Sequence, residues 1–268
     1  MSERSEYAPG EFCWVSLATT DVDGARTFYG ALLGVDWEPA PGPPEETGGY
    51  GFFVKGGKQV AGMGPTQQEG QPSAWSSYIK VEDADATAEK VKESGGQVLF
   101  GPADLPNESG RVAMLQDPTG AFVWINQQQK HPGAQLVNEP GTWNWNNLMT
   151  RDMDAAKDFY GNVFGWTATH NEQAPDFVWM WQVDGQRWPE GLAGLMEIGG
   201  DLPAEMPAHW QVYLMVDGVD DTVAKAEGAG GRLAWGPIDI PVGRIAVVVD
   251  PQGAPFSIIE ATSFPGPR

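Results

Sequence analysis

Several residue types are scarce in this chain of 268 residues, and each scarcity removes a class of protein. Cys13 is the single cysteine, which excludes an internal disulfide and a cysteine-rich zinc site. No histidine lies near Cys13 in the sequence, so we expect a small buried residue there rather than a nucleophile. No stretch approaches about 18 consecutive apolar residues, and the first residues are polar, so we expect a cytoplasmic protein with no membrane partner.

Basic residues are also few. Sixteen Lys and Arg stand against 36 Asp and Glu, which gives a formal net charge of −20, and the acidic residues are spread over both halves of the chain. Such a field repels phosphate backbones and anionic lipid, so we expect no nucleic-acid partner. It keeps the protein soluble and favours the approach of cationic ligands.

Recognisable catalytic motifs are missing as well. The sequence has no GxSxG nucleophile elbow, phosphate-binding loop, dinucleotide fingerprint or HExxH zinc motif. Its three histidines, His131, His170 and His209, are far apart. Arg111 and Arg244 each follow a glycine and could form ion pairs with acids or reach a ligand; the ion pairs are the expected outcome.

What the chain does have is an internal repeat. Asp21, Phe28-Tyr29-Gly30 and Gly34 recur 131 positions later as Asp152, Phe159-Tyr160-Gly161 and Gly165. The later part of each half repeats with slightly different offsets: Gly101-Pro102 recurs as Gly236-Pro237, and Asp117-Pro118 as Asp250-Pro251. Motifs that persist while loop lengths change indicate a tandem duplication.

Each half divides again into two units. In each unit a predicted strand precedes a short amphipathic helix that ends at glycine, and three strands follow. The sequence therefore predicts an α+β fold of four βαβββ modules, at residues 11–66, 73–128, 142–198 and 207–262. These form two tandem domains, at residues 8–130 and 140–263, joined by a linker at 131–139.

At this point the sequence resembles a known family. The patterns D-x₆-FY-x₄-G after a first strand, V-x-D-x-D before a helix ending in Gly-Gly, and DP-x-G before a last strand are similar to those of the vicinal oxygen chelate superfamily. This group contains glyoxalases, bleomycin-resistance proteins and extradiol dioxygenases. The match covers nearly the whole chain and is similar to the two-domain actinobacterial members. Because function varies widely within one fold, the site residues must decide it.

In metal-dependent members, the resemblance implies, His and Glu on the first and last strands project into a cup made by two modules. Counting from the repeated motifs, the six corresponding positions in this chain carry Trp14, Ser76, Trp124, Trp145, Gln211 and Ser257. None is a usual strong ligand for a divalent ion. We therefore expect no metal and no other cofactor.

Aromatic surface stands where ligands would. Indole rings supply wide, flat contact area at little entropic cost, so we expect tryptophans on inner strands to bind a ligand. The predicted ligand-binding set is Trp14, Trp75, Trp124, Trp145, Trp179, Trp181 and Trp210, with Ser76, Gln211 and Ser257. The weaker candidates for catalysis are His209, which shares a strand face with Gln211, and the carboxylates Glu260 and Glu197.

The function we expect is a metal-free small-molecule binding protein. It holds a planar aromatic ligand of the polyketide-antibiotic kind, for self-resistance by sequestration or as accessory to a biosynthetic tailoring oxygenase. Two alternatives stay open: a metal-independent biosynthetic enzyme (hydroxylase-like, cyclase or epoxide-opening), and a metal-dependent glyoxalase-like lyase or dioxygenase. We expect a monomer, with a dimer as the alternative. The residues do not decide whether modules pair as 1+2 and 3+4 or as 1+4 and 2+3.

Overall fold

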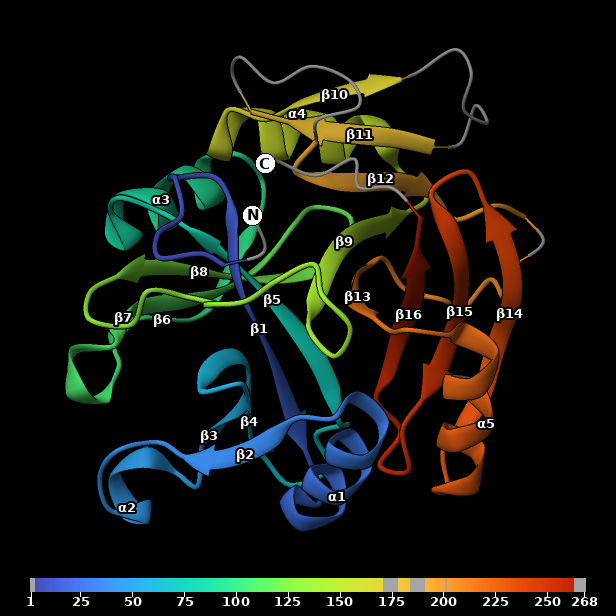
Figure 1. The fold of residues 1–268 in the computed structure, drawn as a ribbon. Coiled ribbons are helices and arrows are strands. Elements are labelled where there is room, and N and C mark those ends of the chain that lie inside the picture. Colours follow the sequence, from blue (N-terminus) through green and yellow to red (C-terminus); the bar gives the residue numbers. More distant parts are fainter. Residues whose placement is uncertain (1–2, 171–177, 184–190, 201, 263–268) are drawn as a thin grey trace.

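The computed structural model describes residues 3–170, 178–183, 191–200 and 202–262, which form an α+β architecture with two eight-stranded sheets (Figure 1). Each half of the chain builds one sheet. Modules 1 and 2 therefore share the first sheet and modules 3 and 4 the second, which decides the pairing that the sequence left open. The predicted order of four βαβββ modules is confirmed.

The first sheet has the strand order β2-β3-β4-β1-β5-β8-β7-β6. Its strands are β1 (Phe12–Thr19), β2 (Asp36–Pro39), β3 (Gly51–Lys55), β4 (Lys58–Pro65), β5 (Ala74–Lys80), β6 (Gln97–Asp104), β7 (Gly110–Gln116) and β8 (Phe122–Gln128). Its helices are α1 (Val22–Leu33), the short α2 (Pro44–Thr47) and α3 (Ala84–Glu93), with a 3₁₀ turn η1 (Pro106–Glu108).

The second sheet repeats this order as β10-β11-β12-β9-β13-β16-β15-β14. Its strands are β9 (Trp143–Thr150), β10 (Thr167–His170), β11 (Val178–Gln182), β12 (Ala193–Glu197), β13 (His209–Met215), β14 (Arg232–Ile240), β15 (Gly243–Val249) and β16 (Pro255–Ala261). Its helices are α4 (Met153–Phe164) and α5 (Val219–Gly228).

The repeated aspartates begin the helices, as predicted. Asp21 accepts a hydrogen bond from the backbone N–H of Gly24 at 3.0 Å, and Asp152 accepts one from Ala155 at 2.9 Å. Each satisfies a backbone donor that the first turn leaves unpaired. Gly34 ends α1 with a positive φ of 64°, a conformation that costs glycine nothing.

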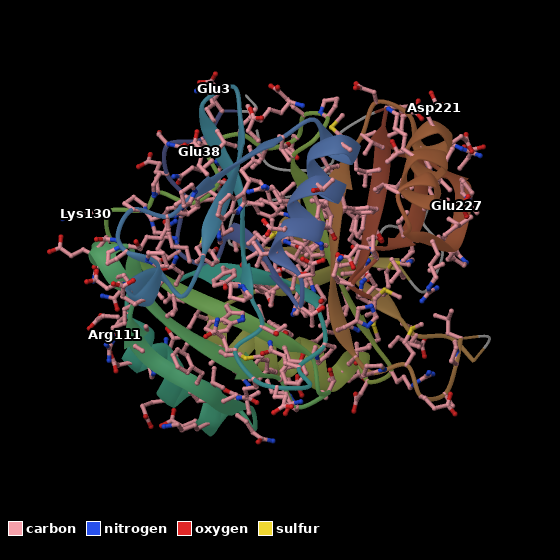
Figure 2. The ribbon with its side chains drawn as sticks, turned by 90° about the horizontal axis from the view of Figure 1, so that it is seen from below. Glu3, Glu38, Arg111, Lys130, Asp221 and Glu227 are labelled. Atoms are coloured by element: carbon pink, nitrogen blue, oxygen red, sulfur yellow. The ribbon has the colours of Figure 1, made fainter. Side chains whose placement is uncertain are left out.

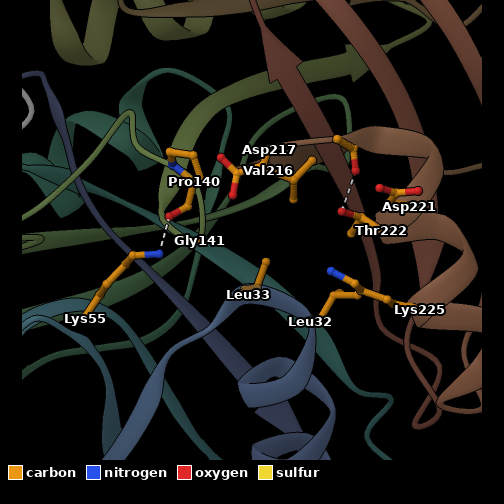
Figure 3. A pocket seen from close by; sticks show the side chains of 11 residues that line it. Leu32, Leu33, Lys55, Pro140, Gly141, Val216, Asp217, Asp221, Thr222 and Lys225 are labelled. Carbon is orange, nitrogen blue, oxygen red and sulfur yellow. Dashed lines mark hydrogen bonds between the residues drawn. The ribbon is translucent and has the colours of Figure 1, made fainter.

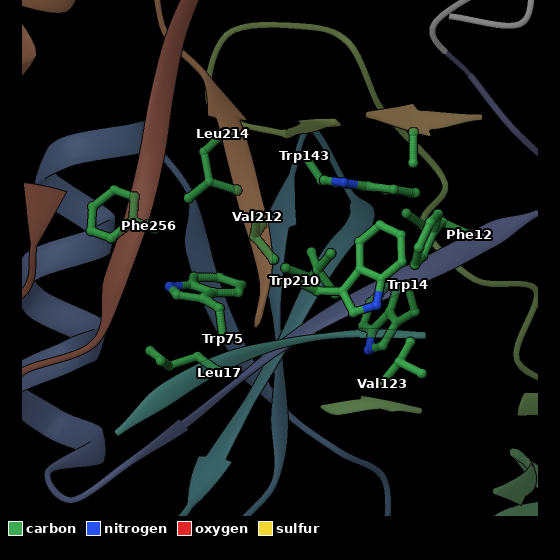
Figure 4. Packing of buried hydrophobic residues seen from close by; sticks show 14 of the residues in the cluster. Phe12, Trp14, Leu17, Trp75, Val123, Trp143, Trp210, Val212, Leu214 and Phe256 are labelled. Atoms are coloured by element: carbon green, nitrogen blue, oxygen red, sulfur yellow. The ribbon is translucent and has the colours of Figure 1, made fainter. Parts of the chain in front are cut away.

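The two halves share one hydrophobic core rather than two separate ones (Figure 4). Phe12 of the first half packs against two tryptophans of the second, with ring centroids 5.6 Å from Trp166 and 5.0 Å from Trp210. The helices also pair across the halves, α1 beside α5 and α3 beside α4 (Figure 1). The duplicated units are therefore one packing unit, because each buries the other's apolar surface.

Two tyrosines link the halves at equivalent places. The hydroxyl of Tyr29 donates to Asp250 Oδ2, and that of Tyr160 donates to Asp117 Oδ2, both at 2.9 Å. Both aspartates are buried, and burial raises the pKa of Tyr29 and of Tyr160. The repeated Phe-Tyr-Gly and Asp-Pro motifs thus supply the two ends of the same hydrogen bond, each from the other half.

Charged side chains gather at the periphery, as Figure 2 shows for Glu3, Glu38, Arg111, Lys130, Asp221 and Glu227. The expected ion pairs form: Arg111 contacts Asp85 at 2.7 Å, and Arg244 contacts Asp220 at 2.9 Å. Cys13 is fully buried, and burial raises the pKa of its thiol. Among the described helices, none is long and apolar enough to cross a membrane.

Replacing Tyr29 with Phe tests the link between the halves. The change leaves a buried carboxylate and the indole N–H of Trp75 without their shared partner, so the free energy of unfolding should fall by about 1–3 kcal/mol. Tyr160→Phe should cost a similar amount in urea denaturation. The control Tyr7→Phe, which removes a hydrogen bond to the carbonyl of Ala134, should cost only about 0.5–1.5 kcal/mol. Unchanged stability in both test variants would contradict this account.

Candidate functional site

Each sheet has a back face that packs against helices and a front face opposite to it. In the first sheet, Leu17 pairs in register with Trp75 on the back face, where Tyr29 of α1 contacts Trp75 at a centroid distance of 5.4 Å. Trp14 pairs with Tyr78, and Ser16 with Ser76, on the front face. Because side chains alternate along a strand, this register assigns every neighbouring position to one face or the other.

The six positions at which metal-dependent members carry ligands all lie on front faces. Trp14, Ser76 and Trp124 share the first front face, where Trp124 pairs with Tyr78. Trp145, Gln211 and Ser257 share the second, joined through Asn147 and Tyr213. The structure thus brings each predicted trio together within its own half.

A tryptophan hydrogen bond organises the first front face. Trp14 Nε1 donates to the hydroxyl of Tyr50 at 3.0 Å, and the Ser16 side chain hydrogen-bonds Tyr50 and Tyr78. Burial raises the pKa of both tyrosines, so they remain neutral hydroxyls. Trp124 stacks on Tyr78 with ring centroids 5.5 Å apart.

The second front face uses an amide where the first uses a phenol. Trp145 Nε1 donates to Asn147 Oδ1 at 3.0 Å, and Asn147 Nδ2 donates to the hydroxyl of Tyr213 at 2.9 Å. Gln211 Nε2 donates to Ser257 Oγ at 3.2 Å. This surface is therefore a neutral polar network beside a tryptophan, flanked by the half-buried thioethers Met149, Met196 and Met215.

One glycine in each half makes room for these hydrogen bonds. A Cβ atom on Gly62 would lie 1.7 Å from the Tyr50 hydroxyl and 3.0 Å from Trp14 Nε1. A Cβ atom on Gly194 would lie 1.7 Å from Asn147 Oδ1. The acceptor of the tryptophan N–H occupies the space that a side chain would fill.

His131 belongs to the first front face, although the sequence placed it in the linker. Its ring stacks on Phe52 at 5.5 Å and meets Trp14 edge-on at 4.6 Å. Its Nδ1 accepts a hydrogen bond from the backbone N–H of Gly133 at 3.2 Å, and burial lowers its pKa to about 4. Sequence reasoning missed this residue; the available signal was a histidine directly after the last strand of module 2.

Four of the predicted ligand-binding tryptophans require a correction. Trp75 and Trp210 lie on back faces, where their Nε1 atoms donate to Tyr29 at 3.0 Å and to Tyr160 at 2.7 Å. Trp179 and Trp181 also lie on the back face, because they pair with Leu195 and Ala193 rather than with Gly194. All four serve packing, since amphipathic strands place every second residue against the helices.

The three candidate catalytic residues are not brought together. His209 lies on the front-face register beside Met149, with Nδ1 2.9 Å from the carbonyl oxygen of Pro207. Glu260 lies on the opposite face and accepts the backbone N–H of Val219 at 3.3 Å, at the start of α5. Glu197 pairs with Thr150 and is exposed. These residues form no acid–base pair with His209.

The donor set does not fit a divalent metal. The six front-face positions offer indoles, hydroxyls and one amide, whereas divalent ions in such sites take imidazole, thiolate or carboxylate ligands. Throughout residues 3–170, 178–183, 191–200 and 202–262, no group of three His, Cys, Asp or Glu side chains could hold an ion. We therefore derive no chemistry through a metal.

A separate cavity of about 170 Å³ lies between the halves, away from both front faces (Figure 3). Leu32 and Leu33 of α1 line one side, Thr222 and Lys225 of α5 another. Lys55 donates to the carbonyl of Pro140 at 2.6 Å on its wall. It is an interface cavity of mixed polarity and shares no residue with the predicted ligand-binding set.

Comparison with known proteins follows the two halves of the chain. Residues 12–125 match the family model of the Glyoxalase/Bleomycin resistance protein/Dioxygenase superfamily, and residues 133–259 match that of a Glyoxalase-like domain. The chain is 42% identical to the putative glyoxylase CFP32 of Mycobacterium tuberculosis over 267 residues, which cover 97% of this chain and 98% of that protein. It is 33% identical to the anthracycline biosynthesis protein DnrV of Streptomyces peucetius, covering 96% and 95%.

Two solved structures share the arrangement. The 2,3-dioxygenase LapB from Pseudomonas sp. KL28 superposes with a TM-score of 0.63 at 13% identity, covering 97% of this chain and 96% of that one. The Mn(II)-bound glyoxalase from Novosphingobium aromaticivorans gives a TM-score of 0.61 at 15% identity, covering 97% and 86%. At these identities the likeness shows the fold alone.

A Gly62→Ala variant tests the packing of the first front face. The added methyl group displaces Tyr50 from Trp14, so we expect a loss of about 1–3 kcal/mol in the free energy of unfolding and a shifted tryptophan emission. Gly228→Ala is the matched control, because its Cβ would meet nothing within 4 Å. Equal stability and emission in the two variants would contradict the geometry.

The lowered pKa of His131 makes stability depend on pH. The unfolded chain, with a histidine pKa near 6.5, binds a proton that the folded state refuses until about pH 4. The stabilisation is therefore complete above pH 6.5 and is lost as the pH falls toward 4, by up to about 3 kcal/mol. His131→Phe, which keeps the stacked ring, should remove this part of the slope in denaturation curves, and His209→Phe should keep it. Identical slopes in wild type and His131→Phe would refute the assignment.

Proposed function

Because the chain belongs to the glyoxalase/bleomycin resistance/dioxygenase superfamily, whose members differ in what their front faces carry, we propose that these faces bind a planar aromatic small molecule without a metal. One observation carries the proposal. The six positions that hold metal ligands in metal-dependent members hold tryptophan, serine and glutamine here, and all six face the same way in their sheets.

The first front face offers the larger aromatic surface. Beside Trp124 lie two rings that remain open to solvent, Phe100 at 50% exposed and Phe122 at 49%. Phe100 is tilted against Trp124 with centroids 5.8 Å apart, and Tyr78 supports Trp124 from the other side. Large exposed rings grouped on one surface are typical of a binding site, because burying them against a flat ligand removes apolar area from water.

The second front face repeats only part of this surface. Trp235, at the position equivalent to Phe100, is 47% exposed. The place of Trp124, however, is taken by Ser257, which is buried under Tyr213 and Gln211. We therefore assign the first front face as the principal site.

The nature of the ligand follows from charge and from relatives. A net charge of −20 attracts cationic groups such as an aminosugar and repels anions. A relative named for anthracycline biosynthesis supports a polycyclic polyketide as the flat part. The protein would then sequester such a compound or carry it to a tailoring oxygenase.

Binding fits the site better than turnover does. General acid–base catalysis needs a donor and an acceptor within reach of the same substrate atom. His209 and Glu260 lie on opposite faces of the second sheet, and Glu260 already accepts a hydrogen bond at the start of α5. The proposal therefore assigns no chemical step to these residues.

A Trp124→Leu variant tests the proposal with daunorubicin as the probe. Loss of the central ring should weaken binding at least about tenfold, measured by tryptophan quenching and calorimetry on protein whose metal content is known from the same batch. Trp37→Leu is the matched control, because Trp37 pairs with Phe53 on the back face. Absence of saturable binding to the folded wild type overturns the proposal. Consumption of the probe, or stoichiometric metal, would favour an enzyme instead.

A further inference from the structure

The front-face side chains of β8 change character along the strand. Phe122 and Trp124 come first, and Asn126 and Gln128 follow at the same alternation. Successive front-face residues lie about 6.6 Å apart, so the strand passes from aromatic to amide surface within the length of a fused three-ring system. A flat ligand resting on Trp124 would therefore reach the amides with one edge.

Three polar atoms at this end have no hydrogen-bond partner among the described residues. They are Asn126 Oδ1, Gln128 Nε2 and His131 Nε2, and each is shielded from solvent. Asn126 is only 5% exposed as a residue. Buried polar atoms are nearly always paired, because an unpaired one loses its hydration for nothing. Three at one place indicate a partner that the protein alone does not supply.

The backbone places these atoms side by side. A Cβ on Gly133 would lie 2.9 Å from Gln128 Nε2, and the N–H of Gly133 donates to His131 Nδ1 at 3.2 Å, so one glycine touches both side chains. Gly110 pairs in register with Gln128, and a Cβ there would lie 2.3 Å from Asn126 Oδ1. Larger residues at either glycine would block the amides.

The hydrogen-bond pattern fixes what each atom offers. Since His131 Nδ1 accepts from Gly133, the proton of the neutral imidazole sits on Nε2. Burial holds the pKa of His131 near 4, so the ring is neutral at physiological pH. The cluster therefore presents two donors, from Gln128 and His131, and one acceptor, from Asn126. Lys80, in register with Asn126, adds a positive charge beside it.

The second half lacks this cluster. Under the repeat offset, Asn126 corresponds to Ile259 and Gln128 to Ala261, both apolar and on the second front face beside Ile245. The duplicated sheet thus serves as an internal comparison. The amides were introduced or kept only where the aromatic surface is also largest.

We propose that Asn126, Gln128 and His131 form a polar edge that binds the oxygen substituents of the ligand on the first front face. A carbonyl or quinone oxygen accepts from Gln128 and His131, and a neighbouring hydroxyl donates to Asn126. The ligand class is therefore a hydroxylated quinone or hydroxyketone polycycle rather than a bare arene. This inference rests on the proposed binding of planar aromatics and specifies it.

Two matched probes test the polar edge: 1,4-dihydroxyanthraquinone-2-sulfonate, and anthracene-2-sulfonate, which has the same three rings and charge without the ring oxygens. Wild type should bind the first at least about tenfold more tightly, because the arene leaves the polar atoms unpaired. In His131→Phe, which keeps the ring, this preference should fall about tenfold. His209→Phe, the same change on the second front face, should leave it unchanged.

The outcomes separate the two proposals. If both probes bind and His131→Phe keeps the full preference, the polar edge is wrong and the aromatic site stands. If neither probe binds wild type, both proposals fail. Should His131→Phe not fold, Gln128→Met removes the neighbouring donor, and a preference that survives this change equally overturns the inference. Loss of preference in His209→Phe would place the ligand on the second front face and also overturn it.

Discussion

The hydrogen bond between a tyrosine of one half and an aspartate of the other, made twice, is the contact on which the rest of the structure depends. Tyr29 donates to Asp250 and Tyr160 to Asp117, and each hydroxyl also accepts a tryptophan N–H. These chains run through buried surroundings, where a missing partner costs more than a present one gains. The duplication therefore persists as one packed unit with two outward front faces.

This arrangement divides the tryptophans into two groups with different duties. Trp75 and Trp210 are committed to the tyrosine–aspartate contacts and cannot meet a ligand. Trp14 and Trp145 hold the front faces in shape through Tyr50 and Asn147. Trp124 alone of the predicted set stacks beside solvent-exposed rings. Back faces keep the repeat because both halves need it, while front faces diverge because only one is assigned a ligand.

Much of the fold was predictable from sequence, because the repeated Asp, Phe-Tyr-Gly and Asp-Pro motifs perform the same local task in each half. Counting from Asp21 and Asp152 was enough to place Trp14 and Trp145 on front faces. Trp179 and Trp181 were assigned wrongly, because their face depends on the register of β11 against β12, which no local pattern reveals. His131 escaped notice because its position results from the path of the linker along the first sheet, a tertiary property.

A crystal structure of the protein with 1,4-dihydroxyanthraquinone-2-sulfonate would test the central claim most directly. The account predicts the ring system against Trp124 on the first front face, its oxygens within hydrogen-bonding distance of Gln128 and His131, and no metal in contact with it. A ligand bound on the second front face, or a metal ion held at the positions of Trp14, Ser76 and Trp124, would contradict it.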